Sequence, residues 1–139
     1  MPRLLVVAAA FGVFTLVATG VAIARRLPYQ FGGAGDPDTV AADAFLHGTG
    51  ISAPLIFVVV IIVLAWIAGR SGSIGIAAAA LVALLGMVGI IAGLMEPALR
   101  TLDPLVTPIS VLGIPLAVLL VVSAVRVALT GIGDKRSTI

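Results

Sequence analysis

The chain has 139 residues, of which 61% are hydrophobic and only 10% are charged. A soluble domain carries about 25% charged residues because its surface contacts water, so most of this surface must face lipid. The net charge is +2, and no basic run precedes the C-terminal tail, which gives no indication of nucleic-acid binding. Cysteine is absent, which excludes disulfides, thiolate nucleophiles and thiolate metal sites.

Four apolar stretches follow one another along the chain. About 20 apolar residues, each rising 1.5 Å, traverse a hydrocarbon core of about 30 Å. The stretches cover residues 4–24, 51–69, 74–95 and 105–126, and each is long enough to cross a bilayer. We therefore predict an all-α integral membrane protein, a bundle of four transmembrane helices that forms one membrane domain over residues 1–139.

The first stretch also has features of a secretory signal peptide. Arg3 precedes it, and Ala22-Ile23-Ala24 resembles a small-residue cleavage site. Its apolar run is longer than the usual signal-peptide core of about 7–15 residues. We therefore expect the stretch to remain as the first transmembrane helix.

The loop after this stretch is predicted to carry a short interfacial helix over residues 37–47. Asp36-Pro37 is typical of a capping carboxylate followed by proline at the first helical position. Apolar residues would form one face of this helix and polar residues, four apart, another, as in helices that lie on a membrane surface. The first set is Val40, Ala41, Ala44 and Phe45, and the second set is Thr39, Asp43 and His47.

Three further positions carry local signals. The short segment 70–73 predicts an antiparallel hairpin, with Ser73 as the cap of the helix that follows. Asp103-Pro104 predicts the start of the last helix. Pro115 lies in the middle of that helix and has no amide hydrogen to donate to the carbonyl of Val111, so we expect a kink there.

Basic residues are distributed unequally between the two sides of such a bundle. With four crossings, the termini and the turn at Arg70 share a side. Because cytoplasmic loops are enriched in Lys and Arg, we expect a cell-membrane protein with both termini in the cytoplasm and the 27–50 loop outside. The terminal side holds Arg3, Arg70, Arg126, Lys135 and Arg136, and the other side holds Arg25, Arg26 and Arg100.

Small residues indicate where helices approach one another, since apolar burial drives little association within lipid. In the first stretch, Gly12, Thr15 and Thr19 recur at spacings of three and four. In the third, Gly86 is followed by Gly89 and Gly93, which form a GxxxG pair. We expect these residues to pack against helices of the same chain, and the alternative for the GxxxG pair is a homodimer face.

Asp43 and His47 are the first candidates for a functional site, because residues four apart meet on one helical face. A carboxylate and an imidazole are suitable metal ligands, and Glu96 or Asp103 would have to supply a third. The alternative is a structural pair at a helix C-terminus, where a charged histidine suits the helix dipole. We favour the structural pair and predict no cofactor.

Glu96 and Arg100 are the second candidates. An ionisable group within a span is a candidate for transport or proton coupling. Glu96, however, lies where the third stretch ends, four residues before Arg100, so we favour an interfacial ion pair. Arg126, at the end of the fourth stretch, is expected to extend toward the lipid headgroups.

No nucleophile motif or phosphate loop is present in the sequence, and no charged residue lies near the middle of a predicted span. We therefore expect no catalytic residues. The leading hypothesis is a small multi-pass protein that serves as a non-catalytic accessory or interaction subunit, in contact with the lipid bilayer and with a membrane-protein partner or a second copy. One alternative is a small oligomeric transporter or channel that uses Glu96, Arg100 and the Pro115 kink. Another is an outer-face metal- or haem-binding protein that uses Asp43, His47 and Glu96.

Overall fold

The computed structural model describes residues 3–29, 35–95 and 104–137, and these ranges contain helices but no strand. The prediction of an all-α fold is therefore confirmed. The elements in chain order are α1 (Arg3–Ala24), α2 (Val40–Asp43), α3 (Leu55–Ala68), α4 (Ser73–Leu94) and α5 (Val106–Ser137).

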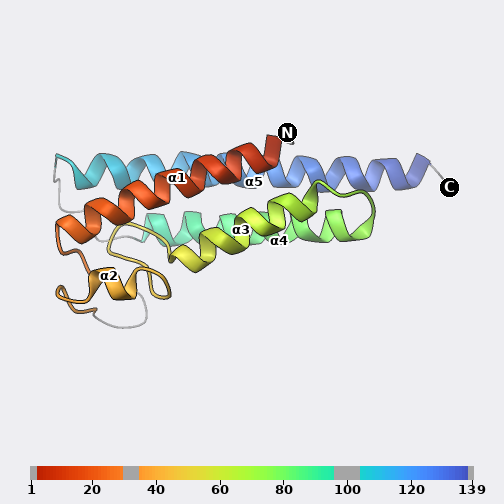
Figure 1. The fold of residues 1–139 in the computed structure, drawn as a ribbon. Helices are drawn as coiled ribbons and strands as arrows, with labels where there is room; N and C mark the ends of the chain where they lie inside the picture. Colours follow the sequence, from red (N-terminus) through yellow and green to blue (C-terminus); the bar gives the residue numbers. More distant parts are fainter. Residues whose placement is uncertain (1–2, 30–34, 96–103, 138–139) are drawn as a thin grey trace.

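The four longer helices lie side by side, and each is antiparallel to its neighbours in the order α1, α3, α4, α5 (Figure 1). The end that holds the start of α1, the α3–α4 turn and the end of α5 is called the basic end below. The opposite end carries α2 and is called the cap end. Consequently α1 and α4 run from the basic end to the cap end, and α3 and α5 run back.

Three helices, α1, α4 and α5, are long and apolar enough to cross a membrane. The fourth, α3, is equally apolar but has only 14 residues, which corresponds to about 21 Å at 1.5 Å per residue. The described residues are thus consistent with a membrane protein, with three helices of spanning length and a shorter helix packed beside them.

Two helices differ in their bounds from the predicted stretches. α3 begins at Leu55 instead of residue 51, because Pro54 has an extended backbone (φ −55°, ψ 137°) and proline disfavours a helical conformation at the residue before it. α5 continues to Ser137 instead of ending at Arg126. Lys135 and Arg136 lie in its last turn, where positive charge suits the helix dipole.

The interfacial helix expected over residues 37–47 is not confirmed, because only Val40–Asp43 is α-helical. Thr39 occupies the N-cap position but makes no capping bond with its side chain, since its hydroxyl contacts the Asp43 carboxylate at 2.7 Å. The cap of α4 is Gly72 rather than Ser73. Asp103 lies outside the described residues.

Small side chains allow the helices to approach closely in the core. One cluster joins all four long helices, and its most buried members are Ala8, Ile61, Ala65, Ala79, Val82, Leu120 and Ala124. A smaller cluster near the cap end contains Ala18, Ala22, Ile51 and Val106. The bundle is therefore closed by apolar contacts along its length.

The contact between α4 and α5 is called the seam below. Ideal Cβ atoms at its glycines would lie 2.7 Å from the facing side chains at Gly131 (Ile76) and Gly86 (Val121), and 3.4 Å at Gly93 (Ile114). From one pair to the next, the position on α4 rises by as many residues as the position on α5 falls. The seam therefore keeps one antiparallel register from the basic end toward the cap end.

Candidate functional site

The cap, defined as residues 35–54, is the longest described segment outside the long helices, and it contacts the turn that ends α1. The amide of Arg26 donates to the carbonyl of Ile23 at 3.2 Å, and the amide of Leu27 donates to the carbonyl of Ala22 at 2.9 Å. Arg26 has a positive φ of 53°. This is a Schellman motif, in which glycine usually takes the left-handed position. Here an arginine occupies it.

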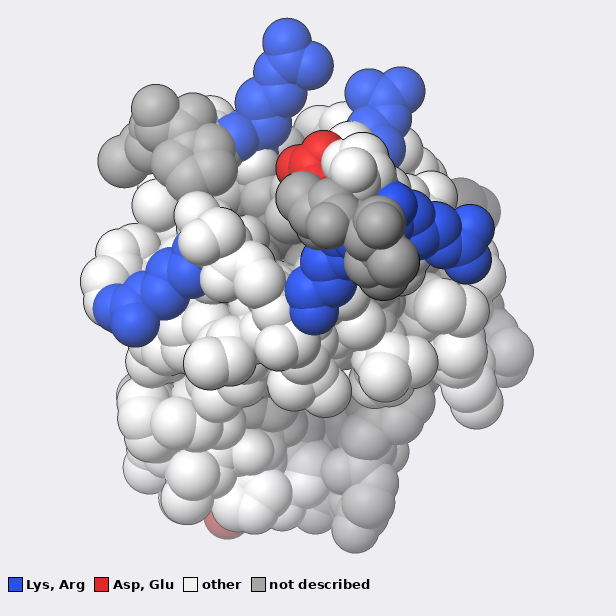
Figure 2. Space-filling view, turned by 90° about the vertical axis from the view of Figure 1, so that its right-hand side faces the viewer, with Lys and Arg blue, Asp and Glu red and all other residues white. Residues whose placement is uncertain are grey.

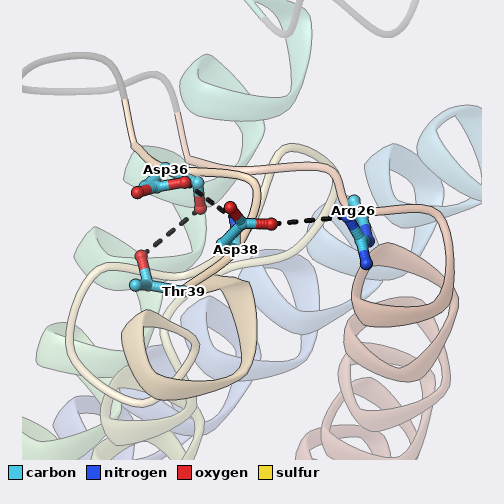
Figure 3. Close-up of polar contacts among 4 residues, drawn as sticks. All are labelled: Arg26, Asp36, Asp38 and Thr39. Atoms are coloured by element: carbon cyan, nitrogen blue, oxygen red, sulfur yellow. Dashed lines mark hydrogen bonds and ion pairs between the residues drawn. The ribbon is translucent and has the colours of Figure 1, made fainter.

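The side chain of Arg26 reaches the first turn of the cap (Figure 3). Its Nη1 lies 3.4 Å from Oδ1 of Asp38, and both side chains are about three-quarters exposed, at 74% and 76%. Asp36 Oδ1 accepts a hydrogen bond from the amide of Asp38 at 2.8 Å. The Asp36-Pro37 pair therefore forms a turn stabilised by its own carboxylate, rather than the first turn of a helix.

Main-chain hydrogen bonds join the cap to the bundle. The amides of Leu55 and Ile56, which begin α3, donate to the carbonyls of Ala44 (3.1 Å) and Phe45 (3.0 Å). The amide of Gly50 donates to the carbonyl of Leu27 at 3.0 Å. The first amides of a helix have no partner within it, so the cap satisfies two donors at the start of α3 and holds α1 and α3 together.

A chain of hydroxyl groups continues this connection into the bundle. Thr49 Oγ1 lies 2.6 Å from Ser52 Oγ, which lies 3.0 Å from Thr19 Oγ1. Thr19 in turn donates to the carbonyl of Thr15 at 2.7 Å, and Thr15 donates to that of Phe11 at 2.8 Å. Each hydroxyl thus has a donor or acceptor nearby, which offsets the cost of burying it.

Asp43 and His47 do lie together, as their spacing predicts. His47 Nδ1 is 3.6 Å from Asp43 Oδ1, and the imidazole stacks on the ring of Tyr29 with centroids 4.9 Å apart. No group of three or more His, Cys, Asp or Glu side chains is placed for metal binding among the described residues. Glu96, the proposed third ligand, lies outside them. The observed geometry is that of a histidine held between a carboxylate and an aromatic ring.

The second pair of candidates, Glu96 and Arg100, also lies outside the described residues. Pro115 lies within α5, which is helical on both sides of it. Arg126 is exposed on the same helix.

The predicted packing residues occupy different environments. A Cβ at Gly12 would lie 3.1 Å from Val58 of α3, and Thr15 and Thr19 are buried on the same helix. Gly86 and Gly93 belong to the seam, whereas a Cβ at Gly89 would have no atom of another described helix within 4 Å. The GxxxG pair therefore does not act as one unit within the chain.

Sequence reasoning missed two features of the cap end. The backbone bonds from Ala44 and Phe45 to α3 have no residue pattern, because any residue supplies a carbonyl. The hydroxyl chain had a partial signal in Thr15, Thr19 and Ser52, but its closure depends on how residues 49–52 fold. Comparisons of the chain with models of protein families, with curated proteins and with solved structures each found no match.

Proposed function

We propose that the chain is a non-catalytic accessory or interaction subunit of a membrane complex, and that the cap is its contact surface. The observation that carries this proposal is the way the cap is built. It is held by main-chain bonds to Leu27, which follows α1, and to the start of α3, yet it leaves Phe45 and Leu46 48% and 64% exposed. A surface ordered before binding loses less conformational entropy on association. Aromatic side chains such as that of Phe45 are also enriched at protein interfaces.

The bundle crosses the membrane four times under this proposal. α1 and α4 run in the same direction, so the intervening chain must return from the cap end to the basic end, and α3 makes most of that return (Figure 1). Five basic residues then lie on the terminal side, which favours a cytoplasmic basic end in the cell membrane. The cap lies outside, where Phe45 and Leu46 meet a membrane-protein partner.

Single cysteines test the orientation, since the chain has none of its own. Ala42 in the cap and Ser71 in the α3–α4 turn are both exposed. We expect Ala42→Cys to react with an impermeant maleimide on intact cells, and Ser71→Cys to react only after the membrane is opened. The reverse pattern would contradict the proposed orientation.

Photocrosslinking tests the contact surface. A photoreactive phenylalanine analogue at Leu46 should give a discrete protein adduct in intact membranes, and Phe45→Asp in the same chain should abolish it. The matched control is the same analogue at Leu84, which is 60% exposed on α4 and should react with lipid. An analogue at Leu46 that yields only lipid adducts, or equal protein adducts at Leu84, would reject the cap as the contact surface.

A further inference from the structure

Independently of that function, the structure contains a second surface feature at the basic end. The first turns of α4 and the last turns of α5 flank an open groove of about 390 Å³. Its walls are apolar, and its outer edge is basic. It is lined by Ser73, Ile76, Ala77, Ala80, Ile132, Lys135 and Arg136.

The basic character of this end extends beyond the groove. Figure 2 shows Lys and Arg side chains reaching outward over the end of the bundle, with acidic atoms visible at a single place among them. The sequence places Arg3, Arg70 and Arg126 at the same end, together with the acid Asp134. A surface with such an excess of positive charge attracts anions.

The groove lies beyond the start of α1. Gly113 of α5 faces Phe14 of α1, with a Cβ-to-ring distance of 3.2 Å, and because the two helices are antiparallel, Arg3 lies beside the part of α5 near Arg126. Lys135 is nine residues further along α5, which is about 14 Å at 1.5 Å per residue. Along α5, the groove therefore lies in the interval from about Arg126 to Lys135.

Large apolar side chains are exposed in this interval. Ile74 is 69% and Leu129 is 62% exposed, close to the charged groups of the helix end. Exposed apolar area next to cations is unfavourable in water but matches the boundary between acyl chains and headgroups. The N-terminus of α4 also lies at the groove and adds partial positive charge there.

We propose that this groove binds an anionic phospholipid, with an acyl chain along Ile76, Ala77 and Ala80 and the phosphate near Lys135 and Arg136. The charge of the rim is complementary to the phosphate, and the apolar walls are complementary to the chain. Basic pockets between transmembrane helices are suited to anionic headgroups. The ligand is a lipid rather than free phosphate, because most of the groove offers no polar group.

Native mass spectrometry of the purified full chain in mild detergent tests this site, with phosphatidylglycerol and phosphatidylcholine in competition. Each Lys or Arg near an anionic surface contributes about 1 kcal/mol, so we expect a roughly 10- to 30-fold preference for phosphatidylglycerol. Two independent variants should remove this preference: the double substitution Lys135→Gln with Arg136→Gln, and Ala77→Trp, which fills the groove. Circular dichroism verifies that both remain helical.

The controls separate a site from general charge. Arg3→Gln removes a cation from the same end but not from the groove, and Leu84→Trp enlarges an exposed residue of α4 outside it; both should keep the preference. The proposal is overturned if all variants keep or lose the preference alike. It is also overturned if inorganic phosphate displaces the lipid. The same holds if the mass spectra show that Ala77→Trp removes the preference by dissociating a dimer of the chain.

Discussion

The seam between α4 and α5 and the cap both depend on glycine, for different physical reasons. In the seam, the missing side chain provides space, since a Cβ at Gly86 would lie 2.7 Å from Val121 Cγ2. In the cap, the missing side chain permits a backbone conformation, because Gly48 has φ 80° and its Cβ would lie 2.7 Å from the carbonyl oxygen of Ser52. The seam is thus held by dispersion contacts along its length, and the cap by hydrogen bonds at defined points.

This difference predicts how each region responds to perturbation. Close packing is lost when a side chain is added at Gly86 or Gly131, because a densely packed interior has no space for it. A cap that is held by hydrogen bonds unfolds locally when one backbone angle changes, whereas the helix bundle stays folded. Variants of the two regions should therefore change different observables, the unfolding of the whole chain for the seam and the local protection of amides for the cap.

The largest effect is expected at the seam. Gly86→Leu places a large side chain against the β-branched Val121, which has little freedom to move, and should lower the free energy of unfolding in detergent by about 1–3 kcal/mol. Gly89→Leu is the matched control, since a Cβ there meets nothing within 4 Å, and should stay within about 0.5 kcal/mol. Equal losses in the two variants would mean that Gly89 also packs in the native protein.

A smaller loss is expected in the cap. Gly48→Ala forces a side chain into a left-handed backbone position, at a cost of roughly 1–2 kcal/mol, and brings it against the Ser52 carbonyl. Hydrogen exchange should accelerate at the amides of Leu55 and Ile56, which bond to the cap. Gly72→Ala, also at positive φ but in open space, should leave those amides protected. Global unfolding of Gly48→Ala would show that the bundle depends on the cap.

These two regions also show how much of the structure can be predicted from the sequence. The apolar lengths and low charge predict helices in lipid, and the small residues Gly12 and Gly86 lie at close helix contacts. Spacing alone does not distinguish Gly86 from Gly89, because the rotation of a helix that is apolar on all sides has no signal in its sequence. The start of α3 was placed too early, although Pro54 stands directly before it. The extension of α5 beyond Arg126 was missed because it contains glycines and charged residues, which a search for apolar stretches excludes.

The candidate site was less predictable than the fold. Residues four apart were expected to meet, and Asp43 and His47 do, but stacking on Tyr29 joins segments 18 residues apart in the sequence. The cap is organised by carbonyl groups that every residue has. Its form depends on tertiary bonds, which local patterns do not encode.

Two buried hydroxyls allow the effect on stability of a hydrogen-bonded polar group to be compared with that of an unbonded one. Ser110 is 3% exposed and its Oγ has no hydrogen-bond partner among the described residues, whereas Thr19 is bonded to Thr15 and Ser52. Ser110→Ala should raise the free energy of unfolding by up to about 1 kcal/mol, and Thr19→Val should lower it by a similar amount. Thermal unfolding in detergent measures both. A loss in Ser110→Ala would show that this hydroxyl is bonded in the protein.

The smallest effect is expected at the pair formed by Arg26 and Asp38. Both side chains are exposed, so the pair itself contributes at most about 0.5 kcal/mol, and Asp38→Asn should be nearly neutral and insensitive to salt. The backbone of Arg26 matters more, because its φ of 53° is unfavourable for a residue with a Cβ. Arg26→Gly removes the same ion pair but relieves this conformation, and should stabilise the chain by about 1 kcal/mol relative to Arg26→Ala, which removes the pair without relief. Two results together would contradict this expectation. Arg26→Gly and Arg26→Ala would lower the free energy of unfolding equally, and salt would lower that of the wild-type chain to the level of the variants. The ion pair, and not the Schellman turn, would then hold the cap to α1.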